Sequence, residues 1–239
     1  MKQLLLLPLL ILANLAASAL EPADLDRYRA DSTKRWEKDI ANFESLDQTE
    51  SHPDDAILFV GSSSIRLWET LARDMAPHPV IQRGYGGAKF SDLAVFAKRI
   101  IHPHDFRAVV IFVANDIVGK ATDLTPEEVA LLYKDVVKTV RTKNAEAPVF
   151  LIAITPTKSR WAAWPQIKKA NAAMQGICQA EHKVHFIPTE KQFLNSEGTP
   201  KTELFRDDQL HLNADGYALW TKIVRAKLDP KLAARPGSE

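Results

Sequence analysis

A passage from strand to helix is predicted at residues 58–68, which read Leu-Phe-Val-Gly-Ser-Ser-Ser-Ile-Arg-Leu-Trp. Residues 56–60 form a short apolar run, typical of a strand buried on both faces of a parallel sheet. Apolar residues then recur at roughly helical spacing from Ile65 to Ala72. Gly61 and three serines therefore lie at the carboxyl end of a strand and the N-terminus of a helix. Open α/β sheets bind ligands at that edge, and helix N-termini carry unpaired N–H groups.

The three serines also have a purely structural interpretation. Serine is a favoured N-cap residue, so Gly-Ser-Ser-Ser alone describes a capped turn as well as it describes a nucleophile. The choice between the two depends on which residues come after the other predicted strands.

Strands alternate with helices along the rest of the chain. Further apolar runs predict strands at residues 80–82, 108–113, 149–154 and 184–187. Helices are predicted at about 21–46, 91–101, 125–140 and 165–181, and after Asn213. The helix that starts at Thr125-Pro126-Glu127-Glu128 is the best marked, by a capping box and a proline in its first turn. This alternation predicts a three-layer α/β/α fold, with a flavodoxin-like parallel sheet of about five strands and helices on both faces.

The composition is that of an ordinary globular protein. Of 239 residues, 46% are hydrophobic and 26% are charged, and the length suits one domain. The net charge of +1 provides no long-range field for nucleic acid or for an anionic membrane.

Residues 1–19 are interpreted as a secretory signal peptide. They combine Lys2, an apolar core at residues 4–15 that is short for a membrane span, and the small residues Ala17-Ser18-Ala19. Cleavage is predicted after Ala19, which makes the protein periplasmic or secreted, with no stable membrane anchor. Residues 20–239 then form a single domain that starts with an amphipathic helix at about 21–46. Intact-mass measurement of secreted protein tests the cleavage site.

Polar residues come after each predicted strand, and the loops after parallel strands share one edge of the sheet. They are Ser62 to Ser64, the Gly84-Tyr85-Gly86-Gly87 turn, Asn115-Asp116 and the loop 155–164, and an Asp208/His211 pair precedes the last helix. Acyl transfer needs such a set: a hydroxyl, a base, a carboxylate that orients the base, and donors for an oxyanion. Each part alone has a structural alternative, since glycine turns are common and Asn115-Asp116 also suits a cap for the next segment of the chain.

His102 and His104 have a spacing that metal sites sometimes use. Pro103 separates them and the sequence offers no matching third ligand, so we predict a solvated loop and no metal site.

The order of these blocks resembles the SGNH, or GDSL-like, hydrolase superfamily. Gly61-Ser62-Ser63, Gly84-Tyr85-Gly86-Gly87, Asn115-Asp116 and Asp208-x-x-His211 look like its four blocks, on the matching strand ends, and the resemblance covers about residues 56–224. It implies Ser63 as nucleophile, His211 as base and Asp208 as its partner. The neighbouring Ser62 and Ser64 compete with Ser63 for the role of nucleophile, and Asp207 competes with Asp208. The resemblance also implies an oxyanion hole formed by the N–H groups of Ser63 and Gly87 and by the Asn115 amide.

The chain departs from the family pattern at three positions. Ser62 stands where the family more often has Asp, Val113 stands where it often has Gly, and Ala88 stands where it often has Asp after the oxyanion glycine. The last two positions bear on the loops that carry Asn115 and Gly87.

The resemblance implies a serine esterase that hydrolyses small acyl or acetyl esters, including esters on carbohydrate, and needs no cofactor or metal. An acyltransferase and a non-catalytic carbohydrate-binding member of the same fold are the alternatives. Arg160, Trp161 and Trp164 lie in the loop after the fourth predicted strand, at the active edge. They are candidates for substrate binding, and tryptophan packing over a loop is the competing interpretation.

Overall fold

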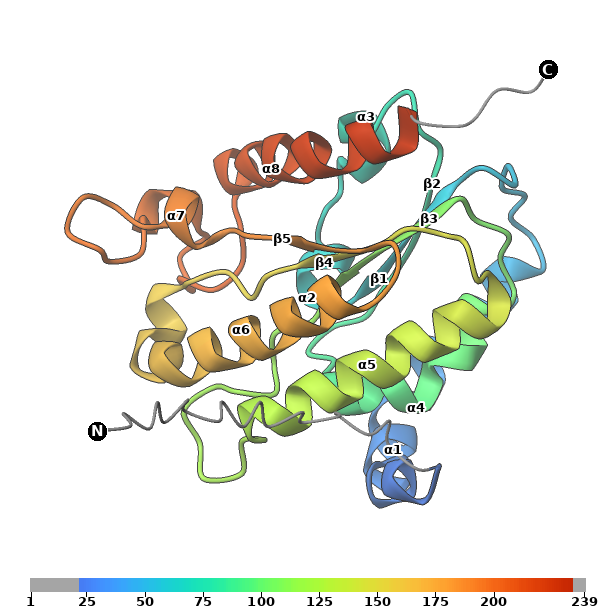
Figure 1. The fold of residues 1–239 in the computed structure, drawn as a ribbon, viewed down its shortest axis with the longest axis horizontal. Coiled ribbons are helices and arrows are strands. Elements are labelled where there is room, and N and C mark those ends of the chain that lie inside the picture. The colour runs from blue at the N-terminus through green and yellow to red at the C-terminus, as the bar shows by residue number, and fades with distance from the viewer. Residues whose placement is uncertain (1–21, 234–239) are drawn as a thin grey trace, which may run out of the picture.

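A computed structural model describes residues 22–233 of the chain, with side chains from residue 25 onward (Figure 1). The predicted signal peptide, residues 1–19, lies outside the described residues. None of the described helices is both long and apolar enough to cross a bilayer.

The centre of the protein is a five-stranded, fully parallel sheet, as predicted. Its strands are β1 (Ile57–Gly61), β2 (Val80–Gly84), β3 (Ala108–Phe112), β4 (Val149–Ile152) and β5 (Val184–Ile187), in the order β2-β1-β3-β4-β5. All residues of β1 and β3 are buried, because helices cover both faces of the sheet. The flavodoxin-like strand order is thereby confirmed.

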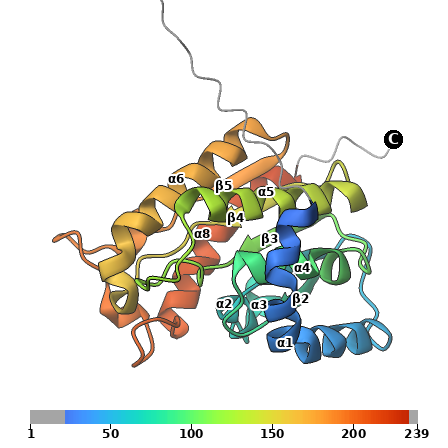
Figure 2. The ribbon, with the colours of Figure 1, turned by 90° about the horizontal axis from the view of Figure 1, so that it is seen from below.

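Helices form a layer on each side of the sheet (Figure 1). One layer contains α4 (Phe90–Ile101), α5 (Pro126–Lys143) and α6 (Trp164–Ala180), and the other contains α8 (Ala214–Ala233) with the short α2 (Ser63–Arg66) and α3 (Leu71–Asp74). The first helix, α1 (Pro22–Asp47), lies beside α4 (Figure 2). Its apolar face is the predicted one, with Ile40 fully buried and Leu25, Trp36 and Phe43 packed against the core.

The helix that was predicted to run from the serines to Ala72 is instead interrupted. α2 ends at Arg66 and α3 starts at Leu71. The amide of Gln82, in β2, donates hydrogen bonds of 2.6 Å and 3.2 Å to the carbonyl oxygens of Ile65 and Trp68. A side chain from the neighbouring strand therefore satisfies carbonyls that a continuous helix would use.

The fourth strand is shorter than predicted, because Ile154 is paired with a side chain. Its N–H donates to Asn171 Oδ1 at 2.9 Å and its carbonyl accepts from Asn171 Nδ2 at 3.0 Å. These bonds hold residues 153–157 at the end of the sheet and direct them toward the active edge.

The irregular stretch after β5 contains α7 (Glu190–Phe193) and the 3₁₀ turn η2 (Thr202–Leu204).

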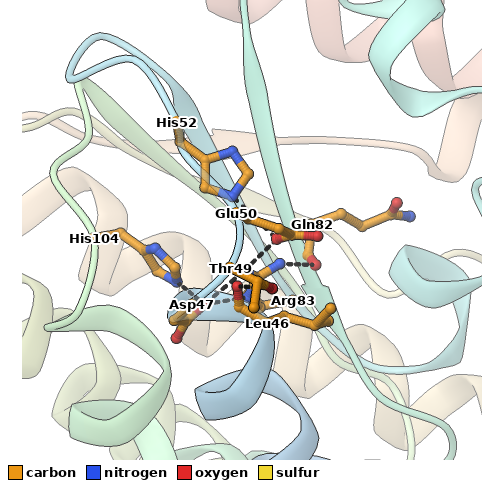
Figure 3. A network of polar contacts seen from close by, with 8 residues as sticks. All are labelled: Leu46, Asp47, Thr49, Glu50, His52, Gln82, Arg83 and His104. Carbon is orange, nitrogen blue, oxygen red and sulfur yellow. Dashed lines mark hydrogen bonds and ion pairs between the residues drawn. The ribbon is translucent and has the colours of Figure 1, made fainter.

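A cluster of charged residues ties the end of α1 to β2 and to the loop after α4 (Figure 3). The Arg83 cluster consists of Asp47, Glu50, His52, Arg83 and His104. The Arg83 side chain is only 3% exposed and donates to Asp47 Oδ1 at 2.5 Å and to Glu50 Oε2 at 2.8 Å.

The histidines of the predicted solvated loop are placed differently from the prediction. His104 is buried, with Nε2 3.5 Å from Asp47 Oδ1. His102 lies against α5, with Nε2 3.2 Å from Thr142 Oγ1. The prediction of a solvated loop was wrong because both partners come from elements distant in the sequence.

Candidate active site

The position of Ser63 is set by the backbone at the end of β1. Gly61 has a φ of 142°, and a Cβ atom built on it would lie 1.9 Å from the carbonyl oxygen of Phe112. Only glycine allows so close an approach. The Ser62 N–H donates to that same oxygen at 2.9 Å, and Ser63 then begins α2. The junction therefore projects the first residue of α2 from the carboxyl edge of the sheet.

Ser63, His211 and Asp208 form a chain of hydrogen bonds. His211 Nε2 lies 3.0 Å from Ser63 Oγ, and His211 Nδ1 lies 2.6 Å from Asp208 Oδ2. Of the competing serines, Ser62 is buried and stands at the N-cap position of α2 without a side-chain capping bond, and the Ser64 carbonyl accepts from Tyr217 Oη. Of the three serines, Ser63 is therefore the one whose hydroxyl contacts the His211 ring.

The tight loop that carries Asp208 and His211 orients the imidazole. Asp208 Oδ1 accepts from the main-chain N–H groups of Leu210 at 3.0 Å and of His211 at 2.9 Å. Burial alone would raise the pKa of Asp208, but these bonds and the His211 ring outweigh it and lower the pKa to about 2. The loop contains Gln209 with a φ of 53°, an uncommon conformation for a residue with a side chain. Because its pKa is about 2, the Asp208 carboxylate is ionised at neutral pH.

The three predicted oxyanion donors lie around the same edge. The Asn115 side chain lines the cavity in front of Ser63 and His211, and its Nδ2 donates one hydrogen bond, of 2.8 Å, to the Ala88 carbonyl oxygen. Gly87, one residue before Ala88, has a φ of 73°, and a Cβ atom built on it would lie 3.6 Å from the ring of Trp36 in α1. Gly87 is not among the described residues that line the cavity, whereas Ser63 and Asn115 are.

The departures at residues 88 and 113 leave this arrangement in place. Ala88 and Val113 are both buried. The Ala88 main chain supplies an acceptor for Asn115, and that role does not depend on its side chain.

Asp116 caps the helix that precedes it in the chain. Its Oδ2 accepts from the N–H of Phe90 at 2.8 Å, at the start of α4, whereas the sequence suggested a cap for the segment after it. The side chain is buried, and burial raises the pKa of Asp116 to about 7. Asn115 thus lines the cavity, whereas Asp116 caps the N-terminus of α4.

The cavity at the site is small. Its volume is about 20 Å³, close to the space that one water molecule needs. Apolar side chains form much of its wall, namely Phe112, Phe205, Leu210, Leu212 and Trp220. Polar lining comes from Thr155 and Thr157 as well as from the residues already named. Thr155 accepts from Trp220 Nε1 at 3.2 Å.

Several of these lining residues escaped the sequence-based prediction. Thr155 and Thr157 stand at alternate positions shortly after the end of β4 at Ile152, and this spacing is the signal that could have identified them. Phe205, Leu210 and Leu212 come from the irregular stretch before α8, where the sequence has no periodicity to guide a prediction.

The three candidate substrate-binding residues are placed differently from one another. Trp164 is buried in the core, and Trp161 stacks on it with ring centroids 5.9 Å apart and an interplanar angle of 16°. Neither tryptophan lines the cavity among the described residues, but Arg160 does. Arg160 donates to the Ala114 carbonyl and to Asn115 Oδ1.

Among residues 22–233, no group of three or more His, Cys, Asp or Glu side chains is arranged to hold a metal ion.

A serine–histidine–aspartate chain at the carboxyl edge of a parallel sheet is the arrangement of the α/β serine hydrolases. Residues 49–219 match the family model of the GDSL-like lipase/acylhydrolase family. The chain belongs to this family and is a carboxylic ester hydrolase.

Solved structures agree with the fold, and 71 chains match it. A GDSL-like lipase from Bacteroides thetaiotaomicron has a TM-score of 0.67 at 14% identity and covers 78% of this chain and 95% of its own. A protein classed as an acylhydrolase from Bacteroides fragilis has a TM-score of 0.68 at 18% identity, with coverages of 89% and 99%. An acetyl xylan esterase has a TM-score of 0.58 at 20% identity, with coverages of 72% and 98%. A search of curated protein sequences gave no match.

Proposed function

We propose that this protein is a serine esterase that hydrolyses short-chain esters, acetyl esters foremost, with Ser63 as nucleophile, His211 as base and Asp208 as the orienting carboxylate. The observation that carries the proposal is the 3.0 Å contact between His211 Nε2 and Ser63 Oγ, which joins residues 148 positions apart. Nucleophile and base within hydrogen-bond reach, with the base oriented by a third group, is the arrangement that activates a hydroxyl.

Each residue of this hydrogen-bonded chain has one role in the proposed reaction. Ser63 Oγ attacks the ester carbonyl carbon while His211 Nε2 takes the hydroxyl proton. Asp208, bonded to Nδ1, fixes the tautomer and stabilises the imidazolium. His211 then protonates the leaving alcohol oxygen, the carbon–oxygen bond breaks, and the acyl-enzyme remains. A water molecule, deprotonated by His211, attacks the acyl-enzyme and releases the carboxylic acid and Ser63.

The negative oxygen of each tetrahedral intermediate needs donors. We assign this role to the N–H groups of Ser63 and Gly87 and to the second N–H of Asn115 Nδ2, whose first N–H is bonded to Ala88. One such donor is worth about 3 kcal/mol of barrier. Ser63 is the first residue of α2, where main-chain N–H groups have no partner within the helix.

The size of the cavity supports a short acyl group. About 20 Å³ of free space, walled by Phe112, Phe205 and Trp220, accommodates a methyl group better than an alkyl chain. We further propose that the alcohol half of the ester is a carbohydrate or another small alcohol, and that the enzyme acts in the periplasm or outside the cell.

A series of p-nitrophenyl esters, from acetate to long chains, tests the proposal on the wild type and on S63A. We expect the highest kcat/KM with acetate, a steep fall as the chain lengthens, and loss of nearly all activity in S63A. A fluorophosphonate label located by peptide mass should lie on Ser63. Labelling of Ser62 or Ser64, or full activity of S63A, contradicts the assignment. A preference for long chains contradicts the proposed acyl size alone.

A further inference from the structure

Arg160 is a partly buried cation whose hydrogen-bond partners are neutral. Its guanidinium donates to the carbonyl oxygen of Ala114 and, at 2.5 Å, to Oδ1 of Asn115. Among the described residues, no carboxylate forms an ion pair with Arg160; Asp116 and Asp123 are the nearby acidic groups that act on it through space. Withdrawing a charge from water is costly even when the withdrawal is partial, so a guanidinium that contacts only neutral oxygens at the edge of an active site calls for a functional reason.

The contacts of Asn115 show what Arg160 does to it. A guanidinium can only donate hydrogen bonds, and a main-chain carbonyl can only accept them. Arg160 therefore requires the oxygen of the Asn115 amide on its side, and the Ala88 carbonyl requires the nitrogen on the opposite side. Turning the amide by 180° would set its NH₂ group against the guanidinium and its oxygen against the carbonyl. Both contacts would then become repulsive.

We propose that Arg160 is a positioning residue for the reaction, which locks the Asn115 amide so that its nitrogen supplies a donor to the oxyanion. The proposal rests on the proposed function, because it assigns Asn115 to the oxyanion hole. Arg160 also contacts the Ala114 carbonyl, so the same side chain fixes the main chain just before Asn115.

The protonation state of Arg160 is compatible with this role. Burial lowers the pKa of Arg160 to about 10, and the negative charges of Asp116 and Asp123 act in the opposite direction. The Arg160 side chain is therefore protonated and a full donor throughout the neutral range.

This role differs from the binding role that the sequence suggested for Arg160. A residue that binds substrate in the ground state changes KM when it is removed. A residue that orients an oxyanion donor acts in the transition state, so its removal lowers kcat with little change in KM.

Steady-state kinetics with p-nitrophenyl acetate on R160M, R160K, N115A and the double variant R160M/N115A tests the proposal. Removal of one oxyanion donor costs about 100- to 1000-fold in kcat, and we expect R160M to lose a part of this, about 10- to 100-fold, at nearly unchanged KM. R160K keeps the charge but lacks the planar fork, so its kcat should fall between those of R160M and the wild type. Because Arg160 acts through Asn115, R160M should cost less than about 3-fold when introduced into N115A.

The matched control is R141M. Arg141 is also partly buried and donates to two main-chain carbonyls, of Ala147 and His182, but near the end of α5 and away from the cavity. We expect R141M to leave kcat and KM unchanged even if it lowers the melting temperature. Circular dichroism and the stoichiometry of fluorophosphonate labelling establish that each variant is folded. If R160M does not fold, R160A assayed with and without added guanidinium ion replaces it, and the ion should restore part of kcat.

Two results overturn the inference. One is an R160M variant with a raised KM and an unchanged kcat, which assigns Arg160 to substrate binding. The other is an equal loss from R160M in the wild type and in N115A, which shows that Arg160 does not act through Asn115. Both leave the proposed function untouched, because that function fails only if S63A keeps its activity or the label lies elsewhere.

Discussion

At residue 61, a hydrogen atom lies where a side chain would collide with the Phe112 carbonyl. We expect G61A to lower the free energy of unfolding by at least about 3 kcal/mol, since a Cβ atom would meet that oxygen and the positive φ disfavours alanine. Urea unfolding measures the change. The control is G176A, inside the C-terminal part of α6, where an added Cβ meets nothing within 4 Å. G176A should stabilise the protein by up to about 1 kcal/mol. Equal midpoints for G61A and the wild type would contradict the steric argument.

Asp208 and Asp207 are adjacent carboxylates with different expected roles. D208N should lower kcat about 10³- to 10⁴-fold. A neutral amide has no negative charge to stabilise the imidazolium, and its NH₂ group can favour the wrong tautomer of His211. D207N should stay close to the wild type, and stopped assays at neutral pH compare the two variants. An equal loss in both would show that the wrong carboxylate has been assigned.

Because the pKa of Asp208 is lowered to about 2, its contribution to stability is present above about pH 4 and is lost as the pH falls through about 2.

The capping of α4 by Asp116 makes the stability of that helix dependent on pH. The pKa of Asp116 is about 7 in the folded protein and 3.8 as an ordinary aspartate, so the protonated form stabilises the fold below about pH 4 and this contribution is lost as the pH rises through 7. D116N keeps an oxygen for the Phe90 N–H and does not titrate. Its stability relative to the wild type should rise between pH 4 and 7, by up to about 4 kcal/mol, and then level off.

Urea unfolding of D116N and of the wild type at several pH values measures this difference. D54N, at an exposed aspartate, is the control for the substitution itself. A difference between D116N and the wild type that is flat from pH 4 to 8 would show that Asp116 is not titrating in this range.

The Arg83 cluster joins three elements, and removing its cation should loosen all of them. R83M leaves Asp47 and Glu50 facing each other without their shared partner, so we expect a loss of about 3 kcal/mol in the free energy of unfolding. R73M removes an exposed arginine that pairs with Asp74 and should change stability by less than about 0.5 kcal/mol. Thermal melts of both variants at neutral pH compare the two. If the melting temperature of R83M equals that of R73M, the Arg83 cluster contributes no net stability.

The elements that sequence predicted well are those whose signals are local. The capping box at Thr125 and the apolar face from Val129 to Val140 predicted α5, which starts at Pro126, next to its N-cap, and ends at Lys143, three residues beyond the predicted end. The break between α2 and α3 was missed because its cause, Gln82, comes from the next strand. His104 was placed in solvent for the same reason, since its partner Asp47 lies in another element.

For the whole molecule, alternation of strands and helices was enough to predict the sheet and the edge where polar residues gather. Family resemblance, rather than spacing, singled out Ser63 and His211, and the structure then brought them together. Arg160 was noticed because it stands in a loop at the active edge. Its bonds to Ala114 and Asn115 could not be predicted, because side-chain directions in an irregular loop depend on packing.

The contact between Ser63 and His211 spans almost the whole sheet in chain order. Ser63 comes directly after the first strand, whereas His211 comes after the fifth, so a chain that has folded only its first half holds a nucleophile without a base. Enzymatic activity is therefore a late reporter of refolding. After dilution from urea, helical circular dichroism should recover before or together with the reaction of Ser63 with fluorophosphonate, and never after it. Refolding in the presence of the label would thus time the moment at which the segments that follow the first and the fifth strands come together.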